Sequence, residues 1–353
     1  MRTTMRAVHL RDLGGRIGLS LDDDAPVPVP GDGEVLLRVR ACGLNQIDLL
    51  TRDGQTLAKI PLPHVSGTEV AGDVVAVGPD AAPWREGDRV VVDPILACGR
   101  CEACRVGETN RCRTGSVYGV QTHGGYAEYA VAPARQLLAL PPGLGYAQAA
   151  AVAVTGPTAW HMLRRRADVR IGEDVLVIAA GAGIGVLGLQ IAKLAGARVI
   201  ATAGSEDKLR QARELGADFA VNHREADWAE QVRAYTGGRG VDVVFEHVGA
   251  STWKGSLRAL ARGGRLVTCG GHSGFDVDVN LWHLFVKEHV LIGSYAGTRT
   301  DFEDVLGLVS DGRIRQVIQQ TFPLEGVQRA QALLDERRVF GKLMLDPTLP
   351  PSP

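Results

Sequence analysis

The sequence has little of what marks several large classes of protein. Its 353 residues carry 39 basic and 40 acidic side chains, and the net charge of −1 leaves no positive excess for nucleic acid or an anionic membrane. The longest basic run is only Arg164–Arg166. The most apolar stretch, Val175–Ala203, is interrupted by glycines, Gln190 and Lys193, so no segment is expected to span a bilayer. The N-terminus has no apolar segment typical of a secretory signal, which predicts a cytoplasmic protein.

Cysteine is also scarce, whereas glycine is in excess. Six cysteines in a long chain without an export signal do not predict a disulfide framework. Glycine supplies 44 residues, about 12% compared with a usual level of roughly 7%. Because these glycines show no collagen-like period, we expect them at turns and where the backbone approaches a ligand. At ~150 residues per domain, the length predicts about two domains.

Two regions with different patterns follow each other along the chain. The first 150 residues contain short β-branched runs bounded by glycine, proline and aspartate, which predict a small barrel-like β domain. From Val175 onward, strand-like runs alternate with helix-like segments, which predicts parallel βαβ units and a doubly wound sheet. The tail is expected to return to the first domain. The predicted elements are strands at Val35–Val39, Gly67–Gly78, Asp88–Asp93, Val175–Ala180, Arg198–Thr202, Asp218–Val221, Val241–Glu246, Arg265–Cys269, Val290–Ser294 and Lys342–Leu345, and tail helices at Phe302–Ser310 and Gly326–Arg338.

Four cysteines lie within fifteen residues in the pattern C-x2-C-x2-C-x7-C, namely Cys98, Cys101, Cys104 and Cys112. Four thiolates can bind one tetrahedral ion, and an all-cysteine shell is the structural form of a zinc site because no position is left for substrate. Interleaved arginines would offset the negative charge of this site. A structural zinc is therefore predicted. Paired disulfides are disfavoured without export, and an iron–sulfur cluster is the remaining alternative at this point.

The segment Ala179–Gly185, with the sequence AAGAGIG, follows a predicted strand and opens a predicted helix. Backbone N–H groups at a helix N-terminus favour an anion, so this turn predicts a pyrophosphate site formed by Gly181, Gly183, Ile184 and Gly185. Alanines at positions 180 and 182 depart from the G-x-G-x-x-G pattern. The turn is still interpreted as a pyrophosphate site because it lies within an alternation of six strands with helices.

The residues after the second strand of this region indicate which dinucleotide is bound. An acid about 20 residues after the turn would bind the ribose of NAD, but Ser205 stands there. Ser205 is the expected N-cap of the next helix, which places Lys208 where the helix dipole opposes a cation. A bound 2′-phosphate would reverse that penalty, so NADPH is predicted. The alternative is NADH, with Glu206 as the ribose acid and Lys208 as a solvated surface residue.

Taken together, these features resemble the medium-chain dehydrogenase/reductase superfamily over nearly the full chain. The resemblance implies an α/β protein with a GroES-like β-rich catalytic domain and a Rossmann domain with a six-stranded parallel sheet. It also implies zinc in the four-cysteine lobe and a homodimer or homotetramer. The implied boundaries are 1–153 completed by 296–353 for the GroES-like domain, and 154–295 for the Rossmann domain. The further matching segments are Gly67–Gly78, Gly87–Val91, Gly124–Tyr129 and Phe340–Lys342.

The alcohol dehydrogenase branch of this superfamily binds a second, catalytic zinc, and its three ligands are missing here. Asn45 stands at the position of the first cysteine, Thr68 at that of the histidine, and Val154 at that of the last ligand. These three residues cannot form a tetrahedral zinc site. The segment around Asn45 is instead similar to the zinc-independent quinone oxidoreductase branch, where L-N-x-x-D-x-x-x-R-x-G is typical. That branch normally lacks the four-cysteine lobe, so the chain combines features of both branches.

The missing catalytic metal changes the expected chemistry. Alcohol oxidation needs a group that lowers the pKa of the hydroxyl, whereas an electron-poor acceptor takes hydride more easily. We therefore predict an NADPH-dependent reductase of a small electrophile, either an α,β-unsaturated carbonyl or a quinone. The protein would supply orientation and hydrogen-bond donors for the oxygen, and the cofactor would supply the hydride.

The resemblance also implies roles for individual residues. Asn45, Asp48 and Thr68 are the predicted catalytic residues, although Asn45 as a loop-capping amide and Asp48 as a structural or ribose-binding residue are alternatives. Predicted cofactor contacts are Thr158 at the nicotinamide end, Ser205, Lys208 and His223 at the adenosine phosphate end, and Lys342 from the C-terminal segment. Two other functions stay open: an alcohol dehydrogenase with a rearranged metal site of Cys42, His64, Asp48 and Glu69, and a catalytically silent NADPH-binding protein.

Overall fold

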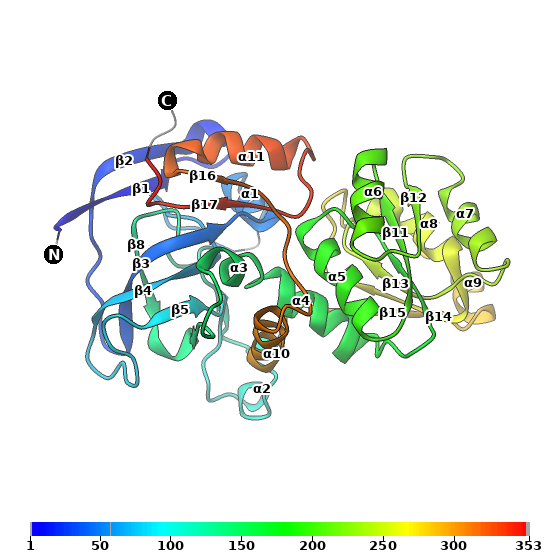
Figure 1. Cartoon of the computed structure of the whole chain (residues 1–353), viewed down its shortest axis with the longest axis horizontal. Coiled ribbons are helices and arrows are strands. Elements are labelled where there is room, and N and C mark those ends of the chain that lie inside the picture. Colours follow the sequence, from blue (N-terminus) through cyan, green and yellow to red (C-terminus); the bar gives the residue numbers. More distant parts are fainter. Residues whose placement is uncertain (1, 57, 351–353) are drawn as a thin grey trace. The chain divides into compact units, whose positions relative to one another are not determined.

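The computed structural model describes residues 2–56 and 58–350, and the chain divides into two compact units (Figure 1). Unit 1 combines the chain up to Val154 with the segment from Thr298 onward, and unit 2 is the continuous segment Thr155–Gly297. These bounds differ by one or two residues from those expected from the sequence. No helix of the described part is long and apolar enough to cross a membrane.

Unit 1 is built on a seven-stranded sheet in the order β16-β17-β3-β4-β5-β9, with β8 also paired to β3. Its apolar core includes Val35, Leu37 and Val39, which alternate along β3 and are fully buried because successive side chains point to opposite faces. The strands of this sheet are β3 (Glu34–Gly43), β4 (Glu69–Val77), β5 (Arg89–Val92), β8 (Tyr129–Pro133), β9 (Leu137–Ala139), β16 (Ile318–Phe322) and β17 (Lys342–Leu345).

Pairing within this sheet brings distant parts of the chain together. The central strand β3 is antiparallel to β4 and to β17, with Gly43 opposite Glu69 on one side and Met344 on the other. The last residues of β3, the first residues of β4 and the strand β17 therefore meet at the same end of the sheet. In Figure 1 the C-terminal segment, coloured orange to red, joins the blue and cyan strands of this unit.

The other elements of unit 1 surround the sheet. Two further strand pairs, β1 with β2 and β6 with β7, form small separate sheets. These elements are β1 (Thr4–Leu10), β2 (Leu19–Pro26), β6 (Ile95–Leu96), β7 (Ser116–Val117), α1 (Gln46–Arg52), α2 (Glu102–Arg105), α3 (Tyr146–Ala151), α10 (Arg299–Ser310) and α11 (Val327–Asp335), with 3-10 turns at Arg16–Gly18, Thr109–Arg111, Ala134–Gln136 and Leu324–Gly326.

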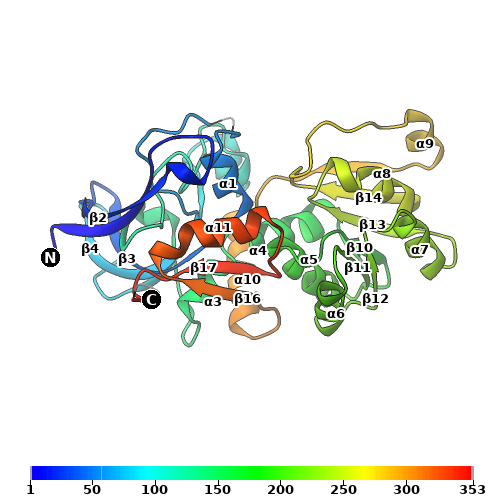
Figure 2. The ribbon, with the colours of Figure 1, turned by 90° about the horizontal axis from the view of Figure 1, so that it is seen from above.

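Unit 2 is a doubly wound domain with a six-stranded parallel sheet in the order β12-β11-β10-β13-β14-β15. Helices α5 and α6 lie on one side of the sheet and α7 and α8 on the other (Figures 1 and 2). The strands are β10 (Asp174–Val177), β11 (Arg198–Ala203), β12 (Phe219–Asn222), β13 (Val241–Glu246), β14 (Leu260–Thr268) and β15 (Val290–Gly293). The helices are α4 (Thr155–Trp160), the π-helical turn His161–Arg166, α5 (Gly183–Leu194), α6 (Glu206–Glu214), α7 (Trp228–Tyr235), α8 (Ala250–Ala259) and α9 (Leu281–Val286).

The predicted fold class is confirmed, and the predicted elements differ from the structure mainly at their ends. Strand β10 stops at Val177 because the residues after it turn: Ala179 has a φ of +48°, outside the range of a β-strand. Helix α10 begins three residues before the predicted start, because Thr298 and Asp301 form a capping box there.

Candidate functional site

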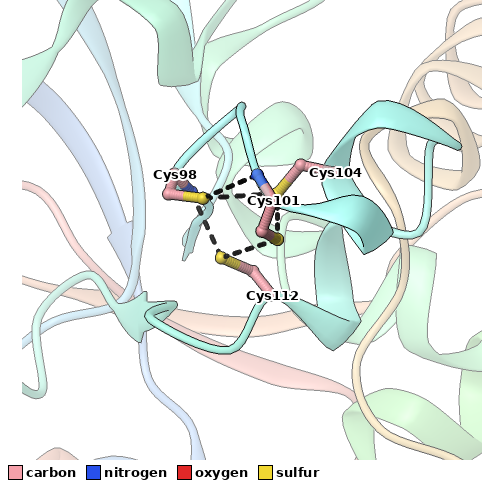
Figure 3. A group of neighbouring side chains, drawn as sticks. All are labelled: Cys98, Cys101, Cys104 and Cys112. Atoms are coloured by element: carbon pink, nitrogen blue, oxygen red, sulfur yellow. Dashed lines mark hydrogen bonds between the residues drawn. The ribbon is translucent and has the colours of Figure 1, made fainter.

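The four cysteine side chains of the predicted zinc lobe converge in unit 1 (Figure 3). Their sulfur atoms lie within 4.8 Å of one another. Cys101 is the N-cap of the short helix α2, and Cys104 is a residue of that helix. The Sγ–Sγ distances are 3.5 Å for Cys101–Cys104 and 3.9 Å for both Cys98–Cys104 and Cys101–Cys112. Four sulfurs at ~2.3 Å from a tetrahedral zinc would be roughly 3.8 Å apart, so this geometry fits the ion.

Backbone groups around the lobe favour thiolates. The N–H of Cys98 donates to Cys112 Sγ at 3.3 Å, and the N–H of Cys101 donates to Cys98 Sγ at 3.4 Å. Such bonds stabilise the charged form and fix the direction of a ligand. With all four sulfurs available as ligands, the lobe can hold one structural zinc with no open position for substrate.

In unit 2, the predicted pyrophosphate turn joins β10 to α5. Gly181 lies in the turn, and Gly183 and Ile184 are the first residues of α5. At Gly185 the helix passes so close to the turn that a Cβ would lie 2.5 Å from the carbonyl oxygen of Ala179. Ala179 has a φ of +48°, and its N–H donates to Thr202 Oγ1 at 3.0 Å. This close approach of helix and strand is what a dinucleotide turn requires, so these residues fit the cofactor.

The residues predicted to bind the adenosine phosphate end lie after β11 and β12 and at the start of α6, and one residue nearby was missed. Ser205 is the N-cap of α6 and accepts the Lys208 N–H at 3.5 Å, as predicted. His223 Nδ1 lies 3.0 Å from Thr202 Oγ1. The alternative ribose acid, Glu206, pairs with Arg213 at 2.9 Å. Sequence reasoning missed Arg224: its Nε lies 3.0 Å from where a Cβ on Gly204 would be, and its side chain is exposed.

A buried carboxylate at the end of β13 was also missed. Glu246 is fully buried, and its Oε1 accepts the N–H groups of His247, Val248 and Gly249. Its Oε2 accepts the hydroxyl groups of Thr252 and Ser256 at 2.9 and 2.7 Å. These bonds hold the turn after β13, beside the pyrophosphate turn that follows the neighbouring strand β10. The available signal was an acid at a strand end followed by a turn glycine.

The three predicted catalytic residues come together in unit 1. Asn45 caps α1, and its amide Nδ2 donates to Thr68 Oγ1 at 3.3 Å. Asp48 Oδ2 accepts the backbone N–H of Asn45 at 2.7 Å and the hydroxyl of Tyr126 at 2.9 Å. Burial raises the pKa of Asp48 to about 6, while these two hydrogen bonds and the Lys342 ammonium oppose the rise. Because the amide of Asn45 reaches across to Thr68, the residue before β4, this residue does more than cap a helix.

Lys342 joins this group of residues. Its side chain is 3% exposed, and its Nζ donates to the carbonyl of Leu44 at 2.6 Å and to Asn45 Oδ1 at 2.7 Å. It also lies 2.7 Å from Oε2 of the fully buried Glu69. Burial raises the pKa of Glu69, and the Lys342 ammonium is the main opposing influence. The Nζ of Lys342 is thus surrounded by oxygens of unit 1, and its predicted contact with a cofactor stays a prediction.

The three positions where a catalytic zinc would have ligands also converge. The N–H of Val154 donates to Oε1 of Glu69 at 3.0 Å. Glu69 is the neighbour of Thr68 in the chain, and Thr68 accepts a hydrogen bond from Asn45, so the three positions lie in one group. Among residues 2–56 and 58–350, the cysteine lobe is the one group of at least three His, Cys, Asp or Glu side chains placed to hold a metal. Cys42, His64, Asp48 and Glu69 are not gathered in this way, which speaks against the rearranged metal site. His64 Nε2 instead lies 3.1 Å from the carbonyl of Gly119.

Thr158 lies buried in α4 of unit 2. Its predicted contact with the nicotinamide stays a prediction, as do the predicted roles of the residues described above.

Comparison with known proteins agrees with both units. Residues 31–142 match the family model described as the alcohol dehydrogenase GroES-like domain, and residues 183–311 match that of the zinc-binding dehydrogenases. The chain is 31% identical to the quinone oxidoreductase of Homo sapiens over 97% of each chain. It is 33% identical to an NAD-dependent alcohol dehydrogenase of Sulfolobus acidocaldarius, covering 98% of this chain and 100% of the relative.

Solved structures give the same result. A crystal structure of an NAD-dependent alcohol dehydrogenase superposes with a TM-score of 0.93 at 45% identity, covering 97% of this chain and 99% of the other. The similar proteins therefore include both quinone oxidoreductases and alcohol dehydrogenases, and the residues of the site have to distinguish between these activities.

Proposed function

Because the chain belongs to the medium-chain dehydrogenase/reductase superfamily and is an NAD(P)H-dependent oxidoreductase, we propose that it transfers hydride from NADPH to an α,β-unsaturated carbonyl or a quinone without a catalytic zinc. One observation carries the proposal. The three positions that would hold the catalytic metal converge, but they carry Asn45, Thr68 and Val154, and the positive charge beside them is the ammonium of Lys342.

The same residues suggest how the protein would promote the reaction. When bound, the nicotinamide supplies the hydride. Asn45 and Thr68 are neutral hydrogen-bond donors suited to an oxygen that gains negative charge as the β-carbon is reduced. Neither can lower the pKa of an alcohol in the way a metal does, so the donor set favours reduction of a conjugated carbonyl over oxidation of an alcohol.

The preference for NADPH is supported by the adenosine end of unit 2. Strand β11 ends at Ala203 without an acid, and Glu206 is engaged by Arg213. Arg224 is exposed beside Gly204, Ser205 caps the next helix and Lys208 is the third residue of that helix. A guanidinium, a hydroxyl and an ammonium are groups that would suit a 2′-phosphate. Substituting Arg224→Ala should raise KM for NADPH roughly tenfold or more and leave KM for NADH unchanged, as expected for loss of one charge-assisted contact.

The decisive test combines turnover with metal content. Purified protein should oxidise NADPH, followed at 340 nm, with quinones and 2-alkenals, and should keep this activity after treatment with a chelator that leaves one zinc per chain. Two zincs per chain, with activity lost when one is removed, would indicate a metal-dependent alcohol dehydrogenase. Tight NADPH binding without turnover of any electrophile would indicate a silent binding protein.

We also propose that two copies associate through α9 and β15 of unit 2. No residue of α9 is buried, although its sequence is LWHLFV, and Trp282 and Phe285 are 66% and 61% exposed. The adjacent β15 is the last strand of the sheet, and an edge strand can pair with a strand of another chain. Light scattering should find a dimer that Phe285→Glu converts to a monomer, while Val29→Glu, at an exposed position of unit 1, leaves the mass unchanged. A monomeric wild-type protein would refute this assembly.

A further inference from the structure

The ammonium of Lys342 is surrounded by oxygens inside unit 1. An ammonium has three N–H donors and no acceptor, and Nζ lies within 2.7 Å of three oxygens, on Leu44, Asn45 and Glu69. A buried cation without such partners would be strongly disfavoured. The carboxylate of Glu69 neutralises the charge, and its other oxygen accepts the N–H of Val154, so the pair is anchored to the backbone.

This arrangement decides which way the Asn45 amide faces. The two ends of an amide are normally assigned from their hydrogen-bonding partners, and here one partner can only donate. The end of the amide 2.7 Å from Lys342 Nζ must therefore be the oxygen. The opposite end is NH2, which lies 3.3 Å from Thr68 Oγ1.

We propose that Lys342 is a positioning residue whose ammonium holds and polarises the Asn45 amide so that Nδ2 is the donor offered to the carbonyl oxygen of the substrate. This inference rests on the proposed function and names the group that makes the site favour reduction of a carbonyl compound over oxidation of an alcohol. A donor of fixed identity suits an oxygen that accepts hydrogen bonds, whereas an alcohol awaiting oxidation has to lose its proton to an acceptor. Hydrogen bonding of the amide oxygen to a cation also polarises the N–H bonds at the other end.

Of the four polar residues in this group, Asn45 keeps the largest accessible surface. It is 9% exposed, compared with 0% for Thr68 and Glu69 and 3% for Lys342. Asn45 is therefore the member that can touch a substrate, and Lys342 acts through it. The positive charge would act on the substrate through the amide, since the Lys342 side chain is 3% exposed and its Nζ faces three oxygens of unit 1.

Two variants separate this role from a contact with the cofactor. Lys342→Met combined with Glu69→Gln removes both buried charges together, so that neither is left unpaired, and frees the amide to rotate. We expect kcat to fall roughly 10- to 100-fold, less than the full loss of an oxyanion donor, with the Kd for NADPH within twofold of wild type. Asn45→Asp keeps the side-chain size and the partner of Lys342 but replaces the donor by an acceptor, and should lower kcat roughly 100- to 1000-fold. Arg6→Gln with Glu128→Gln, which removes another ion pair of unit 1 at 3.2 Å, serves as the control.

The outcomes are distinguishable. A Lys342→Met/Glu69→Gln variant with kcat within twofold of wild type would overturn the proposal, and so would unchanged kcat with a Kd for NADPH raised tenfold, which would make Lys342 a cofactor contact. Full activity of Asn45→Asp would refute Nδ2 as the donor. If wild-type protein reduces no electrophile, the proposed function fails, and hydrogen exchange of the 15N-labelled Asn45 side-chain amide still decides the inference. Slow exchange in wild type that becomes fast in the double variant supports it, and equal exchange in both refutes it.

Discussion

The buried carboxyl of Asp48 predicts an unusual dependence of stability on pH. Its pKa rises from 3.8 to about 6 because burial penalises the charged form more than the Asn45 N–H and the Tyr126 hydroxyl stabilise it. Between pH 3.8 and about 6, the Asp48 carboxyl is therefore protonated more often in the folded protein than in the unfolded chain. Its contribution to stability therefore decreases as pH rises through this window and is constant above it.

The size of the effect follows from the two pKa values. Fully ionising Asp48 costs the folded state about 3 kcal/mol, since the pKa difference is roughly two units at 1.36 kcal/mol each. Lowering the pH from 8 to 5 restores about 1.4 kcal/mol of this, because at pH 5 the folded carboxyl is mostly protonated and the unfolded one is not. An asparagine at position 48 does not titrate, so the Asp48→Asn variant lacks this gain. Its free energy of unfolding minus that of wild type should therefore be about 1.4 kcal/mol lower at pH 5 than at pH 8.

Guanidinium unfolding of wild type and Asp48→Asn at pH 5 and pH 8 measures this difference. The control is Asp32→Asn, which replaces an exposed carboxyl of the same unit, and its stability relative to wild type should be the same at both pH values. If the difference between Asp48→Asn and wild type is also independent of pH, or changes in the opposite direction, then Asp48 is not a destabilised buried carboxylate.

Two further predictions concern the zinc lobe and the nucleotide turn. Cys104→Ser should lower the zinc content from one per chain to none and lower the Tm. Cys269→Ser, outside the lobe, should leave both unchanged. Full zinc content in the Cys104→Ser variant would contradict the four-cysteine site. Gly185→Ala would place a Cβ 2.5 Å from a backbone oxygen, so the turn must shift and the Kd for NADPH should rise at least about tenfold, or 1.4 kcal/mol. Gly307→Ala, where the new Cβ has no atom of another segment within 4 Å, should bind NADPH as wild type does. Equal binding by both variants would refute the role of the close approach.

Features with a local signature could be predicted from the sequence. The six strands of unit 2 follow from apolar runs and their alternation with helices, and the zinc lobe follows from four cysteines whose spacing alone lets them converge. Ser205 as an N-cap followed from the residue type and the helix after it. In each case the residues that interact are close in sequence or repeat with a fixed period.

The arrangement around Asn45 had no such signature. Asn45 and Lys342 are 297 positions apart, and they meet only because β17 pairs with β3 in one particular register. Sequence reasoning placed both residues in the site, with Lys342 as a cofactor contact, which stays a prediction. It did not place Lys342 beside Asn45, because pairing of distant strands cannot be derived from the composition of either strand. Glu246 was missed for a different reason: its partners are local, but an acid at a strand end has no distinctive spacing.

The pairing of β17 with β3 also sets an order in which the two units can be completed during synthesis. Unit 2 is a continuous segment ending at Gly297, so a ribosome that has released this segment has released every residue of the nucleotide-binding unit. Unit 1 still lacks the strand that carries Lys342, and until it arrives the Glu69 carboxylate has no buried cation to pair with. All residues of unit 2 are therefore synthesised before unit 1 is complete, and a chain truncated before β17 would contain the whole of unit 2 but lack one strand of the unit 1 sheet.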